Sequence, residues 1–110
     1  MQNNFIKKKT VFITGSSSGI GFGLAKNFLH NGYEVIICSS NLNKLKKSSK
    51  ALNDCFYVKA DLTREKDIKL AIRKIKNKFK KIDVLVCNYG NSDFKKNNLD
   101  FNHSFNNNFF

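Results

Sequence analysis

A glycine-rich turn between an apolar segment and an amphipathic segment constrains this fold more than any other feature. Residues 10–13 are mostly apolar, and residues 14–21 read Thr-Gly-Ser-Ser-Ser-Gly-Ile-Gly. Apolar residues then recur at helical spacing to about residue 31, so the pattern predicts a strand, a tight turn and a helix. Glycines in that context are typical of dinucleotide-binding proteins, because the new helix presents free N–H groups to phosphates.

The three glycines have separate expected roles. Gly15 allows a tight turn, Gly19 lets the backbone approach a pyrophosphate, and Gly21 lets the helix pack close to the strand. The predicted pyrophosphate-binding residues are Gly15, Ser17, Ser18, Gly19, Ile20 and Gly21. The alternative interpretation is an ordinary glycine-rich turn without a ligand.

The rest of the chain alternates strand and helix patterns. Predicted strands cover about residues 10–14, 33–38, 55–59 and 82–87, and predicted helices cover about residues 19–31, 41–52 and 63–79. Asn41 and Thr63 are the expected caps of the second and third helices. The expected buried faces are Ile20, Leu24, Phe28 and Leu29 in the first helix, and Ile68, Ala71, Ile72, Ile75 and Phe79 in the third.

Strands that alternate with helices through short connections predict an α/β fold with a doubly wound parallel sheet. The crossovers in such a sheet are right-handed. Such a sheet has strand order 3-2-1-4-5-6, and this chain supplies its first four strands only. The fourth strand is therefore an expected open edge. We expect the chain to be the first part of something longer, and these residues alone to be poorly soluble or only partly folded.

Composition narrows the class of protein. The 110 residues, of which 41% are hydrophobic, fit one domain. The net charge of +12 comes mainly from dispersed lysines, which favour solvated helix faces over a nucleic-acid surface. No apolar run reaches the length of a membrane span, and the N-terminus lacks the pattern of a secretory signal. We therefore expect neither a nucleic-acid partner nor a membrane partner.

The cysteines and histidines do not form a metal-binding pattern. Cys38, Cys55 and Cys87 are odd in number and contain no Cys-x-x-Cys pair. They are expected to be reduced thiols in a cytoplasmic protein. His30 and His103 are each isolated in the sequence, so no metal site is predicted.

Three segments, in this order along the chain, resemble motifs of the short-chain dehydrogenase/reductase family. They are residues 14–21, Asp61-Leu62 after the third strand, and Asp-Val-Leu-Val-Cys-Asn-Tyr-Gly at 83–90. The last segment is similar to the family's strand that ends in Asn-Asn-Ala-Gly. The resemblance implies a Rossmann-type fold that binds NAD or NADP. It implies that Asp61 and Leu62 contact adenine, and that Asn88 and Gly90 lie near the inner ribose. Cys87 and Tyr89 depart from the family pattern.

The end of the second strand bears on cofactor choice. An acidic residue there accepts the ribose 2′-hydroxyl of NAD, whereas this chain has Ser39 and Ser40. With no acid to repel a 2′-phosphate, the sequence slightly favours NADP. Ser39, Ser40, Asn41 or Lys44 is expected to contact it.

The resemblance also implies hydride transfer between nicotinamide and a small carbonyl or alcohol substrate, in a protein that forms homo-oligomers. The family uses a Ser and a Tyr-x-x-x-Lys located beyond the fourth strand, and no tyrosine in this chain has the lysine partner. In the tail, Asn108 matches the family's catalytic asparagine. We expect these residues alone to be inactive.

The alternatives to this function are a dinucleotide-binding module without catalysis, a relative of sugar-nucleotide epimerases or dehydratases, and a basic nucleic-acid binder.

Overall fold

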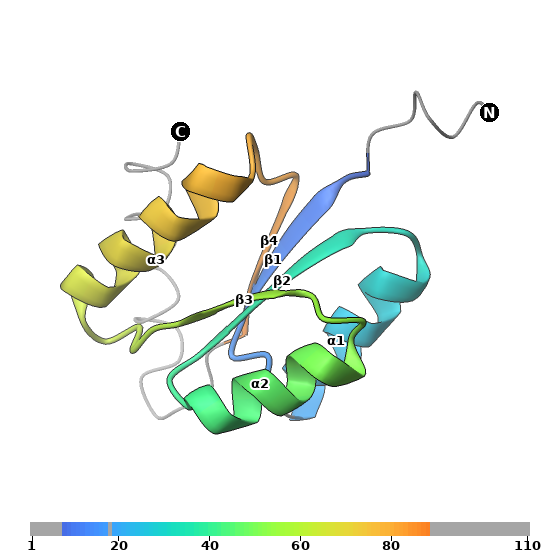
Figure 1. Cartoon of the computed structure of the whole chain (residues 1–110), viewed down its shortest axis with the longest axis horizontal. Helices are drawn as coiled ribbons and strands as arrows, with labels where there is room; N and C mark the ends of the chain where they lie inside the picture. The colour runs from blue at the N-terminus through green and yellow to red at the C-terminus, as the bar shows by residue number, and fades with distance from the viewer. Residues whose placement is uncertain (1–7, 18, 89–110) are drawn as a thin grey trace.

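The computed structural model describes residues 8–17 and 19–88, which form a four-stranded parallel sheet flanked by three helices (Figure 1). The strands are β1 (Thr10–Thr14), β2 (Glu34–Ser39), β3 (Phe56–Lys59) and β4 (Val84–Cys87), and the helices are α1 (Gly19–His30), α2 (Leu42–Ala51) and α3 (Glu65–Lys78). The strand order is β3-β2-β1-β4, as the sequence predicts.

Alternating side chains along the strands build a core on each face of the sheet. Phe12, Ile36 and Cys38 face α3, together with the helix residues Ile68, Ala71, Ile72 and Ile75. Val11, Ile13, Val35 and Ile37 face the other way, toward α1 and α2. Figure 1 shows α3 on one side of the sheet and the other two helices on the opposite side. The sheet is thus covered on both faces, which explains its continuous apolar runs.

Strand β1 is the central strand of this sheet. All five of its residues are buried, and it pairs with β2 on one side and β4 on the other. Strand β4 is the edge of the described sheet, and each of its four residues is half-buried. Within residues 8–17 and 19–88, the fourth strand thus has the edge position that the sequence predicts.

The structure corrects two details of the helices. Thr63 does not cap α3, because its hydroxyl donates to Asp61 Oδ1 at 2.6 Å, and the N-cap position belongs to Arg64. Ile20 is not on the buried face of α1 but is 76% exposed, while Gly21 and Ala25 are buried. Tight packing at the start of α1 uses the small residues and turns Ile20 outward.

The element boundaries differ slightly from the predicted ones. Helices α1, α2 and α3 each end one residue earlier than predicted. Tyr33, Cys55 and Ile82 lie just outside β2, β3 and β4. The cap at Asn41 is confirmed, since its Oδ1 accepts a bond from the Lys44 N–H at 3.0 Å. Gly32 follows α1 with a φ of 84°, as expected of a glycine that ends a helix.

Asp83 links the amino ends of β1 and β4. Its Oδ2 accepts a bond from the Thr10 N–H at 2.7 Å, and its own N–H donates to the Thr10 carbonyl at 2.9 Å. Lys81 Nζ lies 3.3 Å from Asp83 Oδ1. The bond from Thr10, and secondarily the contact with Lys81, hold the pKa of the Asp83 carboxyl below its usual value. The charged form is therefore favoured in the folded chain.

We expect Asp83 to make stability depend on pH in the acid range. Its contribution is fully present above about pH 4, the unfolded value, and is lost as the pH falls through the lower folded pKa. Asp83→Asn should lower the free energy of unfolding at neutral pH and flatten its decline in acid, as measured by urea unfolding across pH. An unchanged acid profile would contradict this role.

Candidate functional site

The carboxyl end of β1 turns into α1 through two glycines with left-handed backbone. Gly15 has a φ of 63° and Gly19 a φ of 64°, a region that L side chains rarely adopt. Helix α1 begins at Gly19, and its first turn contains no acidic residue. Its first N–H groups and positive dipole end therefore face the carboxyl edge of the sheet without a neutralising carboxylate in that turn.

Gly21 brings α1 very close to this turn. A Cβ at position 21 would overlap the Gly15 carbonyl oxygen and would lie 2.8 Å from both Ser16 Cα and Asn88 Nδ2. Two of these three atoms belong to backbone, which cannot give way cheaply. The predicted close approach of helix and strand at Gly21 is therefore present in the structure.

Ser16 links the turn to the end of β2 through hydrogen bonds. The residue is fully buried, and its hydroxyl donates to the Ile13 carbonyl at 2.7 Å. The same oxygen accepts a bond from the Cys38 N–H at 2.9 Å, and the Ser16 N–H donates to the Cys38 carbonyl at 3.2 Å. These bonds extend the pairing of β1 with β2 beyond the last strand residue.

Thr14 and Asn88 join the turn to the end of β4. The Asn88 N–H donates to Thr14 Oγ1 at 3.0 Å, and this hydroxyl donates to the Val86 carbonyl at 3.4 Å. The Asn88 amide Nδ2 donates to the Gly15 carbonyl, also at 3.4 Å. Asn88 therefore lies beside the glycine turn.

Two serine hydroxyls meet where β2 leads into α2. Ser17 Oγ donates to Ser39 Oγ at 3.0 Å, and the Asn41 N–H donates to the same Ser39 oxygen at 3.1 Å. Each hydroxyl has one donor, so one of the two donates to the other and one keeps its donor for another group. The side chain of Asn41 is engaged in capping α2. Ser40 and Lys44 are exposed beside it.

Asp61 and Leu62 follow β3 at the same edge of the sheet. Asp61 Oδ1 accepts bonds from the Thr63 hydroxyl at 2.6 Å and the Thr63 N–H at 3.0 Å. These two bonds hold the pKa of the Asp61 carboxyl below its usual value, so it is an anionic acceptor at neutral pH. Leu62 is only 6% exposed as a whole residue and packs in the core facing α3. Its side chain is therefore part of the core and not of an open surface.

The cysteines at this edge are not poised as nucleophiles. In the strand register, Cys38 and Cys87 flank Thr14 on its two sides. Burial, with a smaller effect of the Asp67 charge, raises the pKa of Cys38 to about 12, and burial also raises the pKa of Cys87. Both groups remain thiols at neutral pH, and the thiolate is the reactive form.

The structure brings most of the predicted residues to one edge of the sheet. Gly15, Ser17, Gly19, Ile20, Gly21, Ser39, Ser40, Asn41, Asp61, Leu62 and Asn88 all lie at, or directly after, the carboxyl ends of the strands. Ser18, Gly90 and Asn108 lie outside the described residues. The sequence interpretation did not single out Ser16 or Ser48. For Ser16 the available signal was its place directly after Gly15 at the end of a buried strand.

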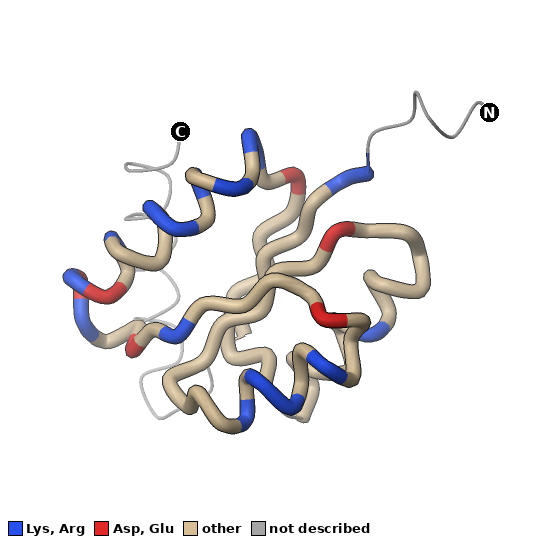
Figure 2. The backbone as a smooth tube through the Cα atoms, in the orientation of Figure 1, with Lys and Arg blue, Asp and Glu red and all other residues tan. Residues whose placement is uncertain are grey.

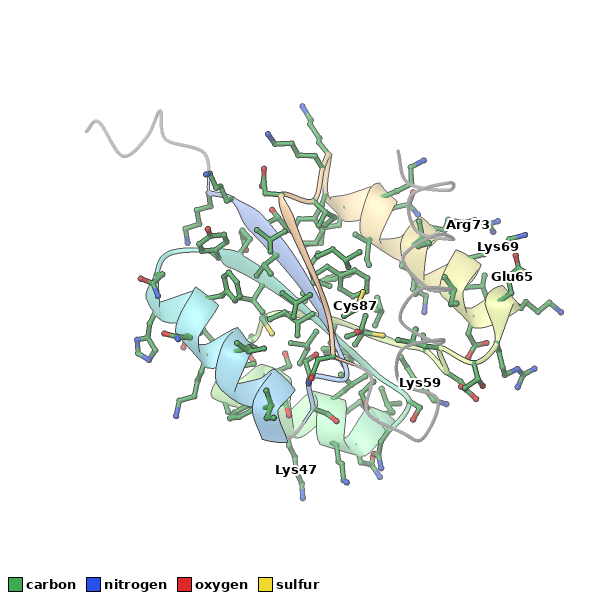
Figure 3. All side chains as sticks on the ribbon, turned by 180° about the vertical axis from the view of Figure 1, so that it is seen from behind. Lys47, Lys59, Glu65, Lys69, Arg73 and Cys87 are labelled. Atoms are coloured by element: carbon green, nitrogen blue, oxygen red, sulfur yellow. The ribbon has the colours of Figure 1, made fainter. Side chains whose placement is uncertain are left out.

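The lysines of the helices are exposed, and Figure 2 marks their positions along the backbone. Lys47 on α2 and Lys69 and Arg73 on α3 point outward in Figure 3 and are exposed. Glu65 forms an exposed ion pair with Lys69 at 3.8 Å. This arrangement agrees with the predicted solvated faces.

The remaining features of the described part of the chain lie away from this edge. A cavity of about 740 Å³ opens at the opposite, amino-terminal end of the sheet, between Tyr33, Cys55 and Lys78, and none of the predicted site residues lines it. No group of His, Cys, Asp and Glu in residues 8–17 and 19–88 is arranged to hold a metal ion. In those residues, no helix is both long and apolar enough to cross a membrane.

Comparison with known proteins identifies relatives of this arrangement. The family model described as short chain dehydrogenase matches residues 9–110. The Dehydrogenase/reductase SDR family protein 7-like of Dictyostelium discoideum is 38% identical over 93 residues, covering 76% of this chain and 29% of that protein. The L-fucose dehydrogenase of Oryctolagus cuniculus is 30% identical over 82 residues, covering 74% of this chain and 29% of that protein. The chain thus spans under a third of the length of these two relatives.

A solved structure has the same fold. The NADP complex of RhlG from Pseudomonas aeruginosa matches with a TM-score of 0.82 and 23% identity, covering 92% of this chain and 46% of that one. This likeness supports the arrangement of strands and helices described above.

We predict that Gly21 and Gly23, two residues apart in α1, respond oppositely to alanine. Gly21→Ala should destabilise the chain by about 1–3 kcal/mol, because the new Cβ overlaps backbone. At Gly23 a Cβ would meet nothing within 4 Å, so Gly23→Ala should stabilise the chain by about 0.5–1 kcal/mol through helix propensity. Urea unfolding of both variants tests this, and equal effects would contradict the close approach.

Proposed function

We propose that this chain, which belongs to the short-chain dehydrogenase family, is the nucleotide-binding part of an NAD(P)-dependent oxidoreductase. The observation that carries the proposal is the N-terminus of α1, which the glycine turn opens toward the carboxyl edge of the sheet. Ligands of doubly wound sheets bind at this edge, where the strand order reverses. Here the reversal falls at β1, which has β2 on one side and β4 on the other.

The pyrophosphate is proposed to lie over the first turn of α1. The space where a Cβ of Gly19 would stand is empty to 4 Å, so a ligand can approach the backbone there. Ile20 next to it exposes 76% of its surface, an unusual position for a large apolar side chain. A bound dinucleotide would cover that side chain and remove apolar area from water.

The adenine of the dinucleotide is assigned to the end of β3, and the inner ribose to the end of β4. Asp61 Oδ1 takes both bonds from Thr63, and Oδ2 receives none from the described residues, which leaves it as an acceptor for the adenine amino group. Asn88, whose N–H is bound by Thr14 Oγ1, is proposed to contact the inner ribose. Gly90 and Ser18 belong to the same proposed site. The residues present therefore fit a dinucleotide.

The proposed reaction transfers a hydride between the nicotinamide ring and a small carbonyl or alcohol substrate. The dinucleotide supplies or accepts the hydride, and the residues at this edge bind and orient it. The catalytic Ser, the Tyr-x-x-x-Lys pair, the role of Asn108 and homo-oligomer formation stay predictions from the family resemblance. A cytoplasmic location stays a prediction from the cysteine pattern.

We further propose a preference for NADP over NAD. Ser39 Oγ accepts a bond from the Asn41 N–H and lies 3.0 Å from Ser17 Oγ, so of these two serine hydroxyls one donates to the other and one can donate to a ligand. A phosphate at neutral pH accepts hydrogen bonds, and no acidic residue stands in the first turn of α2 to repel it. The exposed Lys44 and the N-terminal dipole of α2 add positive charge at the same place.

Titration with NADPH and NADH tests the proposed function. We expect both dinucleotides to bind to the chain, with tighter binding of NADPH, as measured by fluorescence or calorimetry. Binding of neither to a chain that circular dichroism shows to be folded would overturn the proposed function. Equal dissociation constants would remove the NADP preference and leave dinucleotide binding intact.

Ser39→Asp should reverse the cofactor preference. The new carboxylate repels a 2′-phosphate and accepts a bond from a ribose 2′-hydroxyl, so NADPH affinity should fall about tenfold or more while NADH affinity holds or rises. Asn53→Asp is the matched control. It adds the same charge at an exposed residue beyond the C-terminal end of α2, where a φ of 57° suits Asp as well as Asn. If the control shifts the preference equally, the effect is one of net charge and the role of Ser39 fails.

A further inference from the structure

Helix α2 buries two serines in its apolar face. Leu45, Ser48, Ser49 and Leu52 follow the spacing of a core-facing helix stripe, and Ser48 and Ser49 are only 6% and 5% exposed. A buried hydroxyl destabilises a fold unless it finds a hydrogen-bond partner. The question is therefore which groups these two hydroxyls bind.

The two serines bind groups at opposite ends of the sheet. Ser49 Oγ donates to the Cys55 carbonyl at 2.6 Å, next to the start of β3. Ser48 Oγ donates to the Ser17 carbonyl at 2.8 Å, and this acceptor lies 31 residues earlier in the chain. Ser17 is in the glycine turn, directly before the segment in which α1 begins. The bond of Ser48 is thus the one that reaches the proposed pyrophosphate site.

Ser17 is held at two points. Its carbonyl oxygen accepts the bond from Ser48, and its own hydroxyl donates to Ser39 at the end of β2. Glycines on both sides of it, at positions 15 and 19, give the turn more backbone freedom than other residues would. A restraint on the carbonyl therefore selects one backbone conformation among several that the glycines permit.

We propose that Ser48 is a positioning residue for dinucleotide binding, which holds the glycine turn in its phosphate-binding conformation through the Ser17 carbonyl. This inference rests on the proposed function. Ser48 does not itself touch the ligand. Its hydroxyl raises the fraction of chains whose turn is ready to bind, and apparent affinity scales with that fraction.

The test compares Ser48→Ala with Ser49→Ala. Both variants remove one buried hydroxyl from the same helix and gain the same helix propensity, so both should change stability to a similar degree. Ser48→Ala should weaken NADPH and NADH binding by about tenfold, the value of one hydrogen bond. Ser49→Ala should bind both dinucleotides within about twofold of the unmodified chain.

Circular dichroism should first show that both variants are folded at the titration temperature. The pyrophosphate is common to the two dinucleotides, so Ser48→Ala should leave the ratio of the NADPH and NADH dissociation constants unchanged. Unchanged affinity in Ser48→Ala, equal losses in the two variants, or a changed ratio would each overturn the inference and leave the proposed function standing. If the unmodified chain binds neither dinucleotide, the proposed function fails and the inference fails with it.

Discussion

The contact between the first turn of α1 and the Gly15 carbonyl oxygen governs the functional edge of this fold. It exists because residue 21 has no side chain, so the helix axis can lie against the end of the central strand. From this position the helix N-terminus faces the carboxyl edge, and Asn88, directly after β4, can reach the Gly15 carbonyl. A longer side chain at position 21 would push α1 outward and separate the glycine turn from both strands.

Side-chain hydroxyls then fix the turn where regular strand pairing stops. Thr14 binds the end of β4, Ser16 binds the end of β2, and Ser17 joins Ser39 with Ser48. Each bond is short-ranged and directional. The bond of Ser16 is buried and the others are partly buried, where an unpaired partner would be costly. The glycines supply backbone freedom and the hydroxyls remove most of it again. The result is a turn that is open to a ligand on one side and restrained on the other.

The order of strands and helices was predictable because the spacing of apolar residues follows directly from which face of each strand or helix is buried. Each of the four strands has a short apolar run, and α3 has a clean stripe at helical spacing. Details that depend on competition between local partners were less predictable. Thr63 has a side chain that can cap a helix, but its hydroxyl donates a hydrogen bond to Asp61, two residues away, instead. Ile20 fits the helical stripe of α1, yet Gly21 is the residue that packs against the glycine turn, and Ile20 is left exposed.

The sequence by itself determined the alternation of elements, the parallel sheet and the place of the glycine turn, because these follow from local periodicity and from the conformations that glycine permits. It also put two serines on the buried face of α2, where each hydroxyl needs a partner. Only the tertiary structure decided which partners they have. Ser48 meets a carbonyl 31 residues away and Ser49 meets one 6 residues away, although the two serines are adjacent. Successive residues of a helix point in different directions, and the packing of α2 against the sheet decides what lies in each direction.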